Sequence, residues 1–210
     1  MHKKSLGRAA ISGTLRLRQI QKFLNMSGKT FVDANYRFIA AYQEVNARIV
    51  QRQQSLALFV TLTATLLAGL LALHPASNGK QLPVEWLVFG FPVTSLCLAF
   101  LNYKTERAIT NLRSFLSALE KLDSAHERLP SYNTEPRWAH GVNKVRRFHD
   151  IAAAVLATGA NGIGIGVVLQ LYPERLADKP FILSLLILGA GISVLALLII
   201  PRWSYRPLEG

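Results

Sequence analysis

Four stretches of this chain carry no Asp, Glu, Lys or Arg: residues 53–79, 86–103, 151–173 and 180–201. The hydrocarbon core of a bilayer takes about 20 apolar residues of helix, and each stretch is long enough to cross it. With 210 residues, half of them hydrophobic, the chain is too apolar for a disordered basic tail and too short for several domains. The sequence therefore predicts an all-α membrane protein with four transmembrane helices, at about 55–74, 86–103, 151–172 and 181–200.

The basic residues predict how the chain is threaded. Of the 24 Lys and Arg residues, 21 lie in segments 1–52, 104–150 and 202–210, and 3 lie in the loops 75–85 and 173–180. By the positive-inside rule, both termini and the middle segment are cytoplasmic. We expect a bacterial inner (plasma) membrane, with the mitochondrial inner membrane as the alternative. The net charge of +12 is thus a topology signal, and we expect no nucleic-acid partner.

Residues 1–32 form a basic segment without any acidic residue. Its apolar residues recur near helical spacing between the cations, which favours an amphipathic helix on an anionic membrane surface. A mitochondrial transit peptide has the same chemistry, and translation from Met26 is a third interpretation. The sequence leaves these three open.

Residues 33–124 predict a long helical hairpin that contains the first two spans and extends into the cytoplasm. Apolar residues recur at intervals of three and four on both extensions, as in a coiled coil. We expect an interaction face made of Phe38, Tyr42, Val45, Ile49, Ile109, Leu112, Leu116 and Leu119. The alternative is that both extensions lie on the membrane surface. Asp33 is a candidate N-cap, and the second helix is expected to end between residues 123 and 130.

The rest of the chain divides into a linker, a second hairpin and a tail. Prolines at 130 and 136 place the linker at 125–136, before the hairpin 137–201 with the third and fourth spans. Residues 202–210 form a short cytoplasmic tail.

Small residues line one side of two predicted spans. In lipid, close helix packing depends on such residues, either within one bundle or between subunits. The candidate packing or pore residues are Thr61, Thr65, Gly69, Thr158, Asn161, Gly162 and Gly166. Asn161 needs a hydrogen-bond partner at this depth, and Thr61, Thr63 and Thr65 are the expected ones.

No arrangement of residues points to catalysis. His74 lies at the outer edge of the first span, and at depth the four spans contain no Asp, Glu, Lys, Arg or His and no metal-binding pair, so we expect no catalytic residues, cofactor or metal. Acids such as Glu106 and Glu120 alternate with bases on the cytoplasmic helices, a pattern typical of solvated faces.

These patterns favour a non-catalytic assembly or scaffold subunit of a membrane complex. The alternative is a homo-oligomeric channel or pore-forming membrane effector. In layout the chain resembles small bacterial membrane effectors that join paired spans to cytoplasmic helices. The expected partners are the lipid bilayer with its anionic head groups, and either further copies of the chain or the other subunits of a larger membrane complex.

Overall fold

The computed structural model describes residues 33–73, 84–128, 130–174 and 179–207, so the N-terminal segment 1–32 lies outside the described residues. The chain has two compact units, residues 1–37 and 38–210. In the first unit, Asp33 Oδ1 accepts a hydrogen bond of 3.3 Å from the backbone N–H of Asn35. Asp33 is therefore the N-cap of the helix that begins at Ala34, as predicted.

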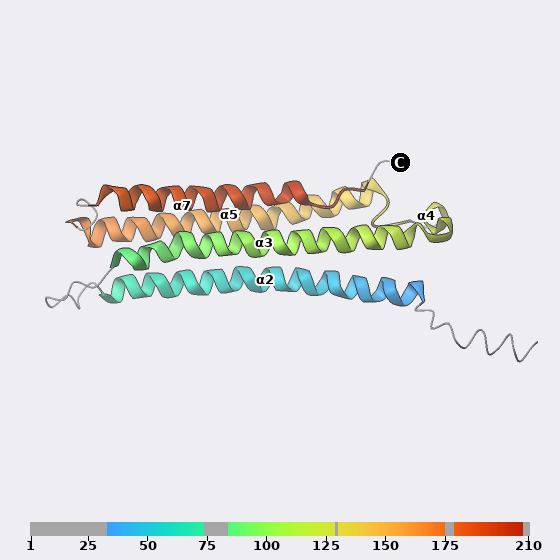
Figure 1. Cartoon of the computed structure of the whole chain (residues 1–210), viewed down its shortest axis with the longest axis horizontal. Helices are drawn as coiled ribbons and strands as arrows, with labels where there is room; N and C mark the ends of the chain where they lie inside the picture. The colour runs from blue at the N-terminus through green and yellow to red at the C-terminus, as the bar shows by residue number, and fades with distance from the viewer. Residues whose placement is uncertain (1–32, 74–83, 129, 175–178, 208–210) are drawn as a thin grey trace, which may run out of the picture. The chain divides into compact units, whose positions relative to one another are not determined.

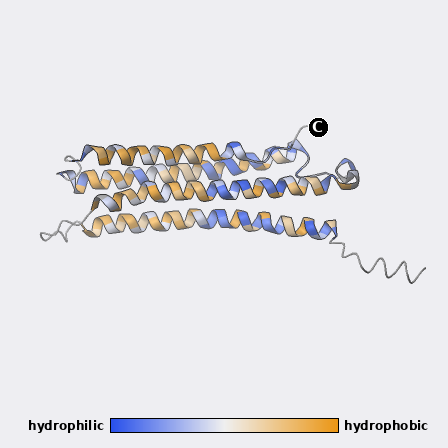
Figure 2. Ribbon diagram, viewed as in Figure 1, coloured by the Kyte–Doolittle hydropathy of each residue, from blue (hydrophilic) through white to orange (hydrophobic). Residues whose placement is uncertain are grey.

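Four long helices dominate the structure (Figure 1), and the described residues contain no strand. They are α2 (Ala34–Leu73), α3 (Val84–Glu120), α5 (Pro136–Leu171) and α7 (Pro180–Ile199). Shorter elements are η1 (Leu122–Ser124), α4 (Ala125–Arg128) and η2 (Ile200–Trp203). The four long helices are apolar and long enough to cross a membrane, as predicted. Figure 2 shows their apolar residues gathered toward one end and their polar residues toward the other.

Proline marks the start of two helices, because its ring suits the first helical turn. Pro136 begins α5 and Pro180 begins α7. The end of the second helix, predicted between residues 123 and 130, comes slightly earlier in the structure. Helix α3 ends at Glu120, and a 3₁₀ turn with a left-handed Ser124 (φ 55°) follows.

Helices α3, α5 and α7 pack closely against one another, whereas α2 approaches none of them as closely at its backbone. Large side chains bridge the wider separation. Phe59 of α2 joins a buried cluster with residues of α3, α5 and α7, and Leu70 joins a second one. Thus α2 is the most loosely packed of the four long helices.

Glycine is required where an aromatic ring of α3 meets α5. A Cβ atom on Gly164 would lie 2.8 Å from ring carbons of Phe91, which is itself buried. The backbone of α5 can therefore approach this ring only because position 164 lacks a side chain.

We predict that Gly164→Ala destabilises the bundle by about 1–3 kcal/mol, the usual cost of overpacking a core. Gly191→Ala in α7 is the matched control, because a Cβ there meets nothing within 4 Å. The control should leave the melting temperature unchanged or raise it, since alanine favours a helix. Equal melting of the two variants in detergent would contradict the packing at Phe91.

Candidate functional site

Four charged side chains from three helices meet inside the second unit. Arg52 of α2 donates a 3.4 Å hydrogen bond to Glu106 Oε2 of α3, and it also donates to Asp150 Oδ1 of α5. Arg146, one turn before Asp150, donates to the same Glu106 oxygen. Only 4 % of Arg52, 0 % of Glu106 and 2 % of Asp150 is exposed. We call these four residues the ion cluster.

The expectation that Glu106 lies on a solvated face is wrong. Alternation of acids and bases along one helix cannot reveal a cation that another helix brings to the acid. Buried charges are tolerated when they are paired, and the two cations and two anions of the ion cluster balance. The cluster links α2 to α3 and α5.

A second polar network lies further along the same helices. Arg113 of α3 donates from Nε to Asn133 Oδ1 (3.1 Å) and from Nη1 to Asn143 Oδ1 (3.2 Å). Asn133 in turn donates to Glu120 through its backbone N–H (3.0 Å) and its side-chain amide (2.7 Å). Burial lowers the pKa of Arg113, and the charge of Arg146 lowers it further. Glu120 therefore ties the linker to α3 and is not simply solvated.

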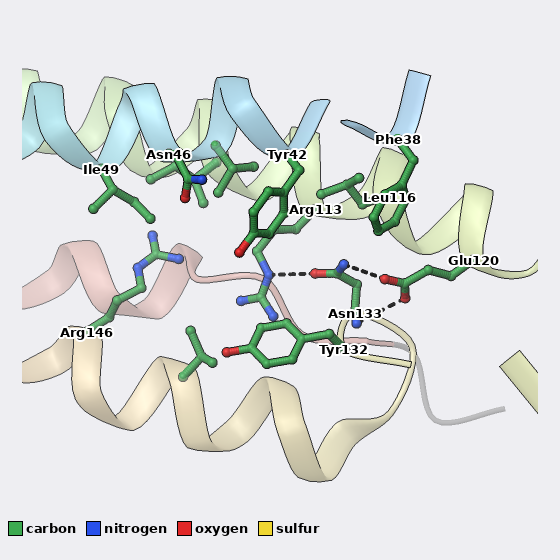
Figure 3. Close-up of a pocket in the computed structure, with 13 residues that line it drawn as sticks. Phe38, Tyr42, Asn46, Ile49, Arg113, Leu116, Glu120, Tyr132, Asn133 and Arg146 are labelled. Atoms are coloured by element: carbon green, nitrogen blue, oxygen red, sulfur yellow. Dashed lines mark hydrogen bonds between the residues drawn. The ribbon is translucent and has the colours of Figure 1, made fainter. Parts of the chain in front are cut away.

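A cavity of about 440 Å³ opens between α2 and these networks (Figure 3). Its polar lining includes Arg113, Glu120, Asn133 and Arg146, and its apolar lining comes from α2, α3, α5 and the linker. Figure 3 shows Tyr42, Asn46 and Ile49 along the α2 side of this cavity. Its lining therefore combines charged groups of both signs with apolar surface.

The predicted interaction face is divided by the structure. Ala41 and Val45 form a buried cluster with Ile109 and Leu116, and Phe38 and Leu112 pack against it. Leu119 is partly buried. By contrast, Tyr42 is 53 % exposed and Ile49 41 % exposed. One part of the stripe thus holds α2 on α3, and Tyr42 and Ile49 line the open cavity of Figure 3.

The small-residue positions in the spans are also mostly open. Thr61 and Thr65 on α2 are exposed, and their hydroxyls donate to the carbonyls of residues 57 and 61. Thr158, Gly162 and Gly166 on α5 are exposed as well, and a Cβ on either glycine meets nothing within 4 Å. Gly69 is half-buried beside Leu87.

Asn161 has a different partner from the one expected. Its side-chain amide donates to Ser95 Oγ of α3 (2.7 Å) and to the carbonyl of Ala157 (2.7 Å), and not to a threonine of α2. The amide is 2 % exposed. It therefore bridges the second and third spans, and it faces away from the exposed glycines of α5.

Sequence reasoning missed the polar side of α3, although a signal was present. Ser95, Asn102, Glu106, Arg113 and Ser117 are all buried, and they recur at intervals of seven and four residues. That spacing places them on one helix face. A second signal is that Arg52 and Asp150 are the last charged residues before the first and third charge-free stretches.

Among residues 33–73, 84–128, 130–174 and 179–207, no three His, Cys, Asp or Glu side chains are placed to hold a metal ion. No family model, curated protein or solved structure matches the chain. Its function is therefore argued from its own geometry.

We predict that Glu106→Gln destabilises the fold by about 3–5 kcal/mol, because it leaves two buried arginines without their shared anion. The matched control is Glu44→Gln, which removes the pair of Glu44 with Arg48 on α2, in which both side chains remain partly exposed to solvent. An exposed pair of this kind contributes about 0.3–0.5 kcal/mol. Denaturant titration in detergent measures both variants. A loss for Glu106→Gln no larger than the control would contradict the buried cluster.

The stability of the fold should depend on pH through His149, which lies just before the third charge-free stretch. Burial lowers its pKa, and the charges of Arg52 and Arg146 lower it further. The unfolded chain therefore binds this proton more readily. Stability should be full above about pH 6.5, the ordinary histidine value, and should be lost as pH falls through the lowered pKa of the folded state.

The measurement is melting temperature against pH for the parent and for His149→Gln. The variant should lose less stability than the parent between neutral and mildly acidic pH. Superimposable pH profiles would show that His149 does not carry the effect.

Proposed function

We propose that this chain is a non-catalytic membrane assembly subunit that associates with further copies of itself. The observation that carries the proposal is how little of α2 is buried within its own chain. Only 11 % of its most apolar stretch is buried within the chain. A helix that contributes so little to its own bundle has most of its surface available to a neighbour.

The open surface of α2 continues from its polar half into its apolar half. Outside the charge-free stretch, Ile39 and Val50 are exposed, at 56 % and 51 %, and we call this pair the α2 apolar face. Within the stretch, Ala57, Thr61, Ala64 and Ala68 are exposed and lie on the same side by helical spacing. The α2 apolar face lies outside the charge-free stretch, where lipid tails do not cover it. The small residues within the stretch allow a close helix neighbour.

A second copy fits this surface because α5 offers another open face of small residues. Thr158, Gly162 and Gly166 lie on a helix other than α2, so one chain presents two faces suited to helix packing. Two different faces on one subunit generate a ring when the rotation between copies closes. A place among other subunits of a larger complex is the remaining form of this proposal.

The membrane arrangement belongs to the same proposal. Both termini are cytoplasmic, and the polar ends of α2 and α3 form a cytoplasmic hairpin, supported by the distribution of basic residues and by the contacts of Val45 with the α3 cluster. The basic segment 1–32 binds anionic head groups. The membrane is a bacterial inner membrane or a mitochondrial one.

A conducting pore is the second candidate function. The exposed hydroxyls of Thr61 and Thr65 favour it, because they give α2 a polar strip within an otherwise apolar segment. The burial of Asn161 against Ser95 removes the most polar group from such a conduit. We therefore rank assembly above conduction.

We predict that Ile39→Lys with Val50→Lys weakens self-association at least tenfold, because two apolar contacts are replaced by like charges. Both side chains are exposed, so the fold should survive. Ala40→Lys with Gln51→Lys is the control, since it adds the same charge to α2 away from the apolar face by helical spacing, at positions that are not buried. The native mass in mild detergent reports the oligomeric state. A parent of monomer mass, or equal loss in both variants, would contradict the proposal.

Flux through liposomes separates the two candidates. Assembly without conduction predicts that the parent matches empty liposomes. Flux in the parent that disappears in Thr61→Val with Thr65→Val, at unchanged native mass, would favour the pore instead.

A further inference from the structure

A second cavity, of about 500 Å³, lies between the N-terminal half of α5 and the segment that follows α7. Its lining is strongly basic, and no acidic side chain belongs to it. We call it the basic pocket; it is lined by His140, Gly141, Asn143, Lys144, Arg147, Pro201, Ser204 and Arg206.

The cations of the basic pocket are not neutralised within the part of the chain that the structure describes. No ion pair between described residues involves Lys144, Arg147 or Arg206, whereas Arg52 and Arg146 are both paired. The three side chains are exposed, and the half-buried Ser204 adds a hydroxyl to the pocket lining. Three cations without an ion-pair partner, together with a hydroxyl in one pocket, form a suitable site for a phosphate group.

The segment after α7, which forms one wall of the basic pocket, is held in place by contacts with three other segments. Tyr205 is buried, and its hydroxyl donates to the carbonyl of Asn133 (2.9 Å), while its own carbonyl accepts from Asn143 Nδ2 (2.6 Å). Thr110 of α3 donates to the carbonyl of Trp203 (3.0 Å), whose ring meets Tyr103 edge-on. Ser204 and Arg206 flank Tyr205, so they are positioned before any ligand binds.

The basic pocket lies at the ends of two charge-free stretches. Arg147 comes four residues before the third stretch, and Pro201 is the last residue of the fourth. Exposed Phe148 and Trp203 adjoin it, and aromatic residues prefer the level of the lipid head groups. Lys144, Arg147 and Arg206 therefore lie at the level of the phosphates of the adjacent leaflet.

We propose that the basic pocket binds the phosphate of an anionic phospholipid head group, a role separate from self-assembly and from the basic segment 1–32. A soluble phosphate compound shares this chemistry. The place of the pocket at the ends of two charge-free stretches and the flanking aromatic residues favour the lipid.

The test is native mass spectrometry of the full chain in detergent, with individual lipids added. Phosphatidylglycerol or cardiolipin should bind at low stoichiometry, phosphatidylcholine should bind at least tenfold more weakly, and inorganic phosphate at the same concentration should not displace the lipid. Displacement by inorganic phosphate would assign the pocket to a soluble ligand and overturn the lipid proposal.

The pocket variant is Lys144→Gln with Arg147→Gln. It should bind phosphatidylglycerol at least about tenfold more weakly than the parent, since two charge-assisted contacts are lost. The matched control is Lys104→Gln with Arg107→Gln, which removes the same charge from exposed positions of α3 just past the second charge-free stretch. The control should change binding less than threefold. An equal loss in both variants would mean general electrostatic attraction and would overturn the site.

Arg206→Gln keeps the test valid if the α5 variant fails to fold. Its side chain is exposed on the segment after α7, so the helices are unaltered. It should weaken phosphatidylglycerol binding at least threefold without a change in melting temperature in lipid-free detergent. Unchanged lipid binding in this variant would contradict the proposal.

Discussion

The ion cluster is the interaction on which the arrangement of the helices depends. Arg52 on α2 is attracted to acids on two other helices, Glu106 and Asp150, and Arg146 neutralises the remaining charge. Because α2 packs loosely elsewhere, this cluster and the few large apolar side chains near it fix its position beside α3 and α5. Loss of one partner leaves a buried charge unpaired, so a shifted or rotated α2 costs several kcal/mol.

The buried polar face of α3 extends this constraint in both directions. Toward the apolar ends of the helices, Ser95 accepts a hydrogen bond from Asn161 and fixes the register of α3 against α5. Toward the polar ends, Arg113 binds Asn133 and Asn143 and stacks 4.9 Å from the ring centre of Tyr205. Polar contacts specify one register because each donor needs its own acceptor, whereas apolar side chains accept several arrangements.

The proposed functions follow from what this internal order leaves open. The core of α3, α5 and α7 is closed by its own contacts, while the outer side of α2 and the small-residue face of α5 have no covering element among the described residues. The basic pocket is open for a different reason: its cations have rigid supports without acidic partners. The proposed assembly and the proposed lipid binding thus use different surfaces of one structure, so a variant of one surface should leave the other function intact.

The sequence by itself determined the four apolar helices, the cap at Asp33 and the proline starts of α5 and α7, because these depend on composition and on neighbours within a few residues. Tertiary structure alone decided which partner each buried polar residue meets. Glu106 resembles any solvated acid until α2 brings Arg52 to it, and Asn161 bonds Ser95 because α3, not α2, lies against that side of α5. The partner of a polar side chain lies 54 or 66 residues away in these cases, and local pattern carries no information over that distance.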